Sequence, residues 1–294
     1  MIYVTGATGF VGGRIVEALR SRGFSVRCLV RESRDATGLE ELGCEIAIGD
    51  VTDPASVEGS MEGCDVVVHL VAIIVGRPED FHQIMEQGTR HVVAVARSHG
   101  IRRFILMSAL GTSEARKDLV PYFHAKWDME RTVVDSGLEY VIFRPSLIFG
   151  PGGGAITDFA RLVRYLPITP IVGSGTQRIQ PIDIADVAAF VAGAIDLPEA
   201  ANRTFDLGGP EILTWNEFWP RLQKAMGKQR RMLHVPTSLL RPQAALFERL
   251  PKPLVTRDQL TMLEAGDNVC DPAPAAHAFG IELTTLDEQL RRSV

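Results

Sequence analysis

The chain has 294 residues, of which 46% are hydrophobic, and its 36 Asp and Glu outnumber its 31 Lys and Arg. The net charge of -5 and the pI near 5.8 argue against nucleic acid as the main partner. No apolar run is long enough to span a bilayer, and the first residues lack the basic and apolar regions of a secretory leader. We therefore expect a cytoplasmic protein without a transmembrane segment, large enough for one α/β domain and a smaller lobe.

The first element is a strand that ends in a glycine-rich turn. Ile2 to Val4 is a short apolar run, and Gly6, Gly9 and Gly12 follow it at intervals of three. Gly6 can turn tightly out of the strand, Gly9 lacks the Cβ that would keep a pyrophosphate away, and Gly12 lets the next helix lie close to the sheet. The free amides that begin this helix favour an anion. The turn predicts a dinucleotide site, with a tight turn that binds nothing as the alternative. Its residues are Thr5, Gly6, Thr8, Gly9, Phe10, Val11 and Gly12.

The end of the second predicted strand decides which nicotinamide cofactor is expected. Arg31, Glu32 and Arg34 lie there, about 20 residues beyond the glycines. Arg31 and Arg34 suit the extra phosphate of NADP(H) through forked, charge-assisted hydrogen bonds. Glu32 instead suits the ribose hydroxyls of NAD. NADP(H) is favoured and NAD stays open, while a solvated charged loop explains Arg34 more easily than Arg31.

Strand and helix patterns alternate to about residue 150. The further apolar runs that predict strands are Ser25 to Val30, Glu45 to Ile48, Val66 to Val71, Phe104 to Met107 and Tyr140 to Phe143. Helical patterns cover Val11 to Ser21, Phe81 to Ser98 and Tyr122 to Ser136. This alternation predicts an α/β fold, a doubly wound parallel sheet with helices on both faces. Such sheets bind ligands beyond the carboxyl ends of their strands.

Tyr122 and Lys126 stand four residues apart in a predicted helix, so they share one helix face. A phenol with a pKa near ~10 is a poor base at neutral pH, and an adjacent ammonium favours its phenolate. Such a pair can pass a proton to or from a substrate oxygen while a nicotinamide moves a hydride. Alternatively, Lys126 holds only the ribose hydroxyls and Tyr122 is a packed aromatic side chain.

The alternation of strand and helix patterns ends at the glycine-rich cluster Gly150 to Gly154. We expect residues 1–150 to form the dinucleotide-binding domain and residues 151–294 mostly a smaller substrate lobe, with 178–196 returning to the main domain. Within this lobe, Ser238 to Leu250 predicts a lid helix over the cleft. The alternative is a surface for a quinone-like ligand, a membrane face or a partner complex.

Three motifs together resemble the short-chain dehydrogenase/reductases of the extended or atypical kind. They are Thr5 to Gly12, Tyr122 to Lys126, and Phe143 to Pro151. The likeness continues through Gln180 to Val187 and is strongest to the branch that contains the nucleotide-binding accessory subunit of complex I. Bacterial members of this branch are often labelled nucleoside-diphosphate-sugar epimerases.

The resemblance implies a Rossmann fold with Tyr122, Lys126 and Ser108 as catalytic residues. The cofactor-binding positions that it implies are Asp50, Val51, Leu70, Val71, Ala72, Ser108, Tyr122, Lys126, Pro145, Ser146 and Ile148. Two positions depart from the family pattern. Leu110 stands where typical members have Ser or Thr, and Met85 stands where they have Asn. These departures weaken the case for the family's full proton relay.

We therefore expect an NADP(H)-dependent oxidoreductase that acts on a small carbonyl or hydroxyl compound. Two alternatives stay open: a non-catalytic accessory or assembly factor attached peripherally to a redox complex, and a nucleoside-diphosphate-sugar epimerase or dehydratase. No metal is expected, because the histidines show no ligand spacing. The four cysteines lack CxxC spacing and predict reduced thiols. The substrate and the oligomeric state are not indicated.

Overall fold

The computed structural model describes residues 1–33, 36–248 and 256–294. It divides the chain into two compact units. Unit 1 comprises Met1–Pro145, Ile184–Leu207 and Pro272–Glu282, and unit 2 comprises Ser146–Asp183, Gly208–Asp271 and Leu283–Val294. In the described part of the chain, no helix is long and apolar enough to cross a membrane.

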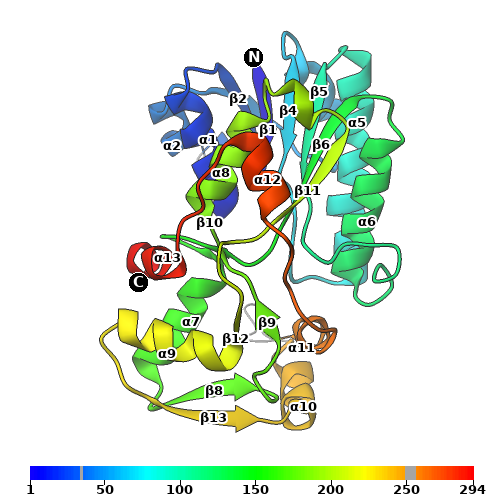
Figure 1. The fold of residues 1–294 in the computed structure, drawn as a ribbon. Helices are drawn as coiled ribbons and strands as arrows, with labels where there is room; N and C mark the ends of the chain where they lie inside the picture. Colours follow the sequence, from blue (N-terminus) through cyan, green and yellow to red (C-terminus); the bar gives the residue numbers. More distant parts are fainter. Residues whose placement is uncertain (34–35, 249–255) are drawn as a thin grey trace. The chain divides into compact units, whose positions relative to one another are not determined.

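A seven-stranded parallel sheet forms the centre of unit 1 (Figure 1). The strands lie in the order β11-β6-β5-β4-β1-β2-β3, and every ladder between neighbours is parallel. They are β1 (Ile2–Thr5), β2 (Val26–Val30), β3 (Glu45–Ile48), β4 (Val66–His69), β5 (Arg103–Met107), β6 (Glu139–Pro145) and β11 (Arg203–Leu207). All residues of β1, β4 and β5 are buried, because helices cover both faces of a doubly wound sheet. The predicted fold class is confirmed.

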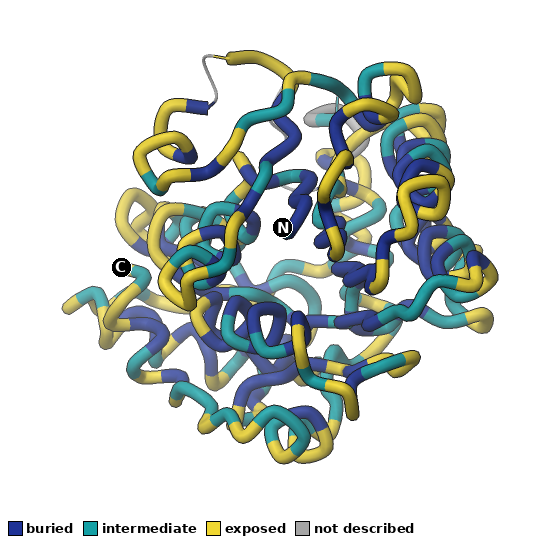
Figure 2. Tube along the Cα trace, turned by 90° about the horizontal axis from the view of Figure 1, so that it is seen from above, coloured by how far each residue is buried: buried dark blue, intermediate teal, exposed yellow. Residues whose placement is uncertain are grey.

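Helices pack on the two faces of this sheet. On one face, α1 (Phe10–Ser21) packs against α8 (Ile184–Gly193), and on the other α5 (Gly88–Ser98) packs against α3 (Pro54–Glu58) and α6 (Pro121–Val134) (Figure 1). Figure 2 shows buried and exposed segments alternating along the helices, as expected where one helix face meets a core. The remaining helical segments of unit 1 are α2 (Thr37–Glu41), η2 (Gly59–Met61), α4 (Pro78–Asp80), η4 (Pro198–Ala200) and α12 (Ala273–Phe279).

The helix predicted over Phe81 to Ser98 is divided in two. Phe81–Gln87 forms a π-helix, η3, and α5 follows it directly. The Thr89 hydroxyl, in the first turn of α5, donates to the Met85 carbonyl of the π-helix at 2.5 Å. A π-helix of this kind has no simple periodic signal, so apolar spacing alone could not predict it.

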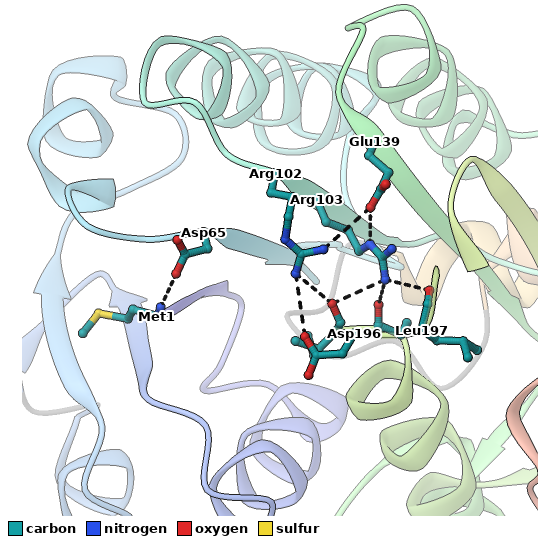
Figure 3. Close-up of polar contacts among 9 residues, drawn as sticks. Met1, Asp65, Arg102, Arg103, Glu139, Asp196 and Leu197 are labelled. Atoms are coloured by element: carbon teal, nitrogen blue, oxygen red, sulfur yellow. Dashed lines mark hydrogen bonds and ion pairs between the residues drawn. The ribbon is translucent and has the colours of Figure 1, made fainter. Parts of the chain in front are cut away.

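The buried Arg103 forms hydrogen bonds that connect the amino-terminal end of the sheet to the carboxyl-terminal end of α8 (Figure 3). Arg103, the first residue of β5, donates to the carbonyls of Ala194 at 2.5 Å and Leu197 at 3.0 Å, and to the Glu139 carboxylate at 2.5 Å. The last carbonyls of a helix lack partners within the helix, and a cation there also suits the helix dipole. These contacts lie at the end of the sheet opposite the carboxyl ends of its strands, where ligands are expected.

Unit 2 has its own core of aromatic side chains. Trp215, Phe218 and Trp219 of α9 (Trp215–Ala225) surround Phe159 of α7 (Gly154–Tyr165), with ring centroids 5.3 to 5.7 Å apart. The strands pair two by two: β7 (Ile148–Phe149) with β10 (Ile182–Asp183), β9 (Arg178–Ile179) with β12 (Leu213–Thr214), and β8 (Ile168–Val172) with β13 (Arg231–Val235). The other helices are α10 (Thr237–Phe247), α11 (Arg257–Glu264) and α13 (Leu286–Ser293). The helix predicted over Ser238 to Leu250 corresponds to α10, and its last two residues lie outside the described ones.

Candidate functional site

The glycine turn joins the carboxyl end of β1 to the start of α1. Gly6 has φ +75°, and a Cβ built on Gly12 would lie 2.1 Å from the Gly6 carbonyl oxygen. The helix therefore packs directly on the turn, at a distance that only glycine permits. Gly9 is the N-cap of α1, and no side chain among the described residues caps this helix. The amides of the first turn, at Phe10 and Val11, and the positive end of the helix dipole are thus free to receive a pyrophosphate.

The end of β4 lies beside this turn. The Leu70 amide donates to the Thr5 carbonyl at 3.2 Å, and a Cβ on Gly6 would lie 3.0 Å from the Leu70 carbonyl carbon and 3.1 Å from the Val71 nitrogen. Of the residues predicted for the cofactor, the structure brings Thr5, Gly6, Leu70 and Val71 together. Thr8 and Ala72 are exposed in their loops.

The residues predicted for the adenosine half follow β2 and β3. Arg31 is exposed directly after β2. Asp50 follows β3, and its carboxylate accepts from the Thr52 amide at 2.8 Å and from the Thr52 hydroxyl at 2.9 Å. Val51 is buried and packs on Gly88, where a Cβ would lie 2.8 Å from a Val51 methyl. Arg34 lies outside the described residues.

Helix α6 brings Tyr122 and Lys126 together. The Lys126 ammonium lies 5.8 Å from the centroid of the Tyr122 ring and donates to the Met107 carbonyl at 2.7 Å. Lys126 is 2% exposed, so its charge is held by that carbonyl and by nearby groups rather than by water. The bond to Met107, the last residue of β5, places the ammonium at the carboxyl end of the sheet.

Burial dominates the titration of both side chains. It raises the pKa of Tyr122 to about 12 and lowers the pKa of Lys126 to about 8. The nearby Glu130 carboxylate partly offsets the lowering of the Lys126 pKa. The phenol therefore stays protonated at neutral pH. The sequence predicts that the ammonium favours the phenolate, whereas desolvation is the larger effect on Tyr122 in the structure.

The Ser108 hydroxyl is held by a buried ion pair. It donates to the Glu130 carboxylate at 2.5 Å, and Glu130 also receives two hydrogen bonds from the Arg144 guanidinium, at 2.5 and 2.8 Å. Glu130 is 3% exposed, and the bidentate arginine compensates its burial. The sequence analysis did not single out Glu130 or Arg144. Glu130 lies on α6 and Arg144 on β6, so only the tertiary structure shows that the two side chains meet beside Ser108.

A family model with the description NAD(P)H-binding matches residues 6–198 of the chain. The protein belongs to this NAD(P)H-binding family. The match spans the glycine turn, the Tyr122–Lys126 pair and the return of the chain in α8. It confirms the predicted class of cofactor, a nicotinamide dinucleotide, and leaves the choice between NAD and NADP open.

Its relatives confirm the resemblance to atypical short-chain dehydrogenase/reductases. Ceramide reductase from Caulobacter vibrioides is 28% identical over 249 residues, which cover 84% of this chain and 77% of that protein. NADH dehydrogenase (ubiquinone) 1 alpha subcomplex subunit 9 from Arabidopsis thaliana mitochondria is 28% identical over 291 residues, 92% of this chain and 71% of that subunit. Among solved structures, the NADPH complex of an Escherichia coli NADPH-dependent quinone oxidoreductase has the same fold, with a TM-score of 0.79, 21% identity, and 99% and 98% of the two chains covered.

The two residues that depart from the pattern of typical short-chain dehydrogenase/reductases, Met85 and Leu110, are both buried. Met85, where typical members have Asn, is fully buried in the core of unit 1. Leu110, where they have Ser or Thr, is 7% exposed. Both side chains are apolar, so neither position can relay a proton.

A buried histidine links the end of β1 to α5, a role that the sequence analysis missed. The His69 ring lies 2.7 Å from the Thr5 hydroxyl through Nδ1 and 3.0 Å from the Thr89 hydroxyl through Nε2. Because Thr89 donates to the Met85 carbonyl, its oxygen accepts from Nε2, and Nδ1 then accepts from Thr5. Burial lowers the pKa of His69 to about 3, so the ring stays neutral. The two residues that end β1 and β4, Thr5 and His69, are paired in register, and only that pairing identifies the contact.

The last three predicted positions lie where β6 ends. Pro145 is the final residue of unit 1's first segment, and Ser146 and Ile148 belong to unit 2. The Ser146 hydroxyl donates to the Gln180 carbonyl, and Ile148 pairs with Ile182 between β7 and β10.

Proposed function

We propose that the protein is an NADP(H)-dependent oxidoreductase that reduces a small carbonyl compound. The observation that carries this proposal is the pair on α6, the protonated phenol of the partly buried Tyr122 beside the ammonium of the buried Lys126. When bound, the nicotinamide supplies or accepts the hydride. The 28% identity to a ceramide reductase agrees with reductase chemistry.

Tyr122 serves as the acid of this reaction. With a pKa raised to about 12, its hydroxyl carries a proton at neutral pH and donates it to the substrate oxygen as the carbonyl carbon is reduced. The phenolate that remains is stabilised by the ammonium 5.8 Å from its ring. The Met107 carbonyl holds that ammonium in place, and Ser108 is a third catalytic candidate because it follows Met107 directly.

Tyr122→Phe tests the proposed acid. We expect NADPH affinity to stay unchanged and turnover on a panel of aldehydes, ketones and quinones to fall by about 10²-fold or more, the scale of general acid catalysis. Stopped-flow oxidation of NADPH measures the loss, and Tyr140→Phe, on β6 in the same unit, is the matched control. Turnover that survives in the Tyr122 variant refutes the assigned role.

Arg31→Ala tests the cofactor preference. Arg31 is exposed directly after β2, where a guanidinium can bind the 2′-phosphate of NADP(H). We expect NADPH binding to weaken by about 1–3 kcal/mol, the scale of lost charged hydrogen bonds, and NADH binding to change little. Isothermal titration measures both, with the exposed Arg97→Ala as control. Equal or tighter NADH binding by the parent protein contradicts the NADP preference.

A non-catalytic, cofactor-stabilised module is the second candidate. It is favoured by the engagement of the Ser108 hydroxyl with Glu130 and by the apolar residues Met85 and Leu110. The likeness to a complex I subunit fits such a module, attached peripherally to a redox complex. Parent protein that binds NADPH but turns over no member of the panel supports this candidate. Retained NAD together with turnover of a sugar nucleotide instead indicates an epimerase.

We place the protein in the cytoplasm. Cys28, Cys44 and Cys64 are buried thiols, and burial raises the pKa of Cys44 and Cys64 above the usual range. Buried, protonated thiols are typical of a reducing compartment.

A further inference from the structure

Unit 2 carries an exposed apolar surface on and around the sheet of β8 and β13. We call it the β8–β13 surface, and its members are Tyr165, Leu166, Ile168, Leu233 and Leu239. Leu233 is 54% exposed and Tyr165 74% exposed. Single exposed apolar side chains are normal, but several on one strand pair and on the segments next to these strands in sequence indicate an interaction site.

The register of the two paired strands explains why these apolar side chains face away from the core of unit 2. Residues of a strand alternate between its faces, and Thr169 and Ile171, both fully buried, point into the core of unit 2. The Thr169 hydroxyl accepts from the Gln223 amide of α9 at 3.1 Å. Ile168 and Leu233 lie on the opposite face, because Leu233 pairs with Pro170 and Ile168 with Arg231. An outer sheet face is normally polar, and here it is mostly apolar, with Arg231 at its edge.

Basic residues outnumber acidic ones in the segments that carry this surface, although four of them form ion pairs: Arg161 with Asp158, Arg178 with Asp267, Arg221 with Glu211 and Arg241 with Glu264. Residues 159–182, which contain β8, and residues 218–247, which contain β13, include nine Lys and Arg and no Asp or Glu. This composition contrasts with the net charge of -5 of the whole chain. Arg164, Lys228 and Arg231 are exposed and form no ion pair with any other residue that the structure describes. They flank the amino-terminal ends of β8 and β13.

From this arrangement we infer that the β8–β13 surface binds the headgroup region of an anionic lipid bilayer. Exposed Leu, Ile and Tyr side chains enter the boundary between headgroups and acyl chains, and Lys and Arg beside them bind the lipid phosphates. Neither signal alone gives stable attachment, but an apolar anchor together with a basic patch does. An acidic protein partner is the competing occupant, and the experiment separates the two.

Sedimentation with vesicles tests the inference on the full chain. We expect the protein to pellet with vesicles of phosphatidylcholine mixed with phosphatidylglycerol and to stay in solution with phosphatidylcholine alone. Leu233→Glu should lower the partition coefficient by about tenfold through the lost apolar anchor and the added charge. Arg231→Glu should lower it by at least about fivefold. Raising the salt from about 0.1 M to about 1 M should release part of the bound protein, since screening shortens from about 10 Å to about 3 Å.

Matched variants in unit 1 separate a local surface from a change in net charge. Ile48→Glu changes a side chain that is also 54% exposed, and Arg97→Glu reverses an exposed arginine on α5. Both should bind vesicles as the parent does, and thermal unfolding of all four variants should match the parent. The inference is overturned if the parent does not pellet with anionic vesicles, if it binds phosphatidylcholine equally well, or if the unit 1 variants lose as much binding. NADPH affinity and turnover, measured alongside, report on the proposed function independently.

Discussion

We expect Gly12→Ala to abolish dinucleotide binding and to lower the free energy of unfolding by about 3 kcal/mol or more. The added Cβ would lie 2.1 Å from the Gly6 carbonyl oxygen and 2.9 Å from the Ala7 Cα. Both neighbours are backbone atoms, so the contact can be relieved only by moving α1 away from the turn. That movement displaces the amides that receive the pyrophosphate. Urea denaturation measures the stability, and isothermal titration with NADPH measures the binding.

The next residue supplies the control for this experiment. A Cβ on Gly13 meets nothing closer than the Ala7 carbonyl oxygen at 3.9 Å, and Gly13 lies in the same helical turn. Gly13→Ala should therefore leave NADPH binding intact and raise stability by about 0.5–1 kcal/mol, because alanine is the better helix former. If the two variants behave alike, the close packing of α1 on the turn does not hold the site together.

We expect the protein to lose stability as the pH is lowered from 6.5 toward 3, with His69 as one cause. Its pKa is about 3 in the folded protein against an ordinary value of 6.5, so between these values the unfolded chain binds one more proton. The contribution of His69 is complete above pH 6.5 and falls as the pH decreases, by up to about 1.4 kcal/mol per pH unit. Urea denaturation at several pH values across this window measures the slope.

His69→Gln removes the titrating ring and keeps a donor and an acceptor for Thr89 and Thr5. We expect its stability to depend less on pH between 6.5 and 4.5 than that of the parent, by up to about 1.4 kcal/mol per unit. His124→Gln, which changes an exposed histidine of α6, should keep the parent's slope. An unchanged slope in the His69 variant would show that the ring is protonated, or solvated, in the folded protein.

The sequence by itself determined the parts of this protein that depend on near neighbours. The three glycines lie within seven residues, and Tyr122 and Lys126 are one helical turn apart, so strand, turn and helix geometry follow from local spacing. The same reasoning predicted the parallel sheet, since each apolar strand pattern is followed by a helical one. The resemblance to the short-chain dehydrogenase/reductases rests on these local motifs.

Only the tertiary structure decided the contacts between distant segments. The Thr5–His69 contact joins residues 64 apart, and the Ser108–Glu130 bond joins residues 22 apart. The pairing of β8 with β13, which creates the apolar surface of unit 2, has no local signal either. Strand order and register depend on how the whole chain buries its apolar faces, and no window of neighbouring residues contains that information. For the same reason, the sequence identified Tyr122 and Lys126 as a pair, but only the packed protein shows that burial, more than their mutual charge, governs their titration.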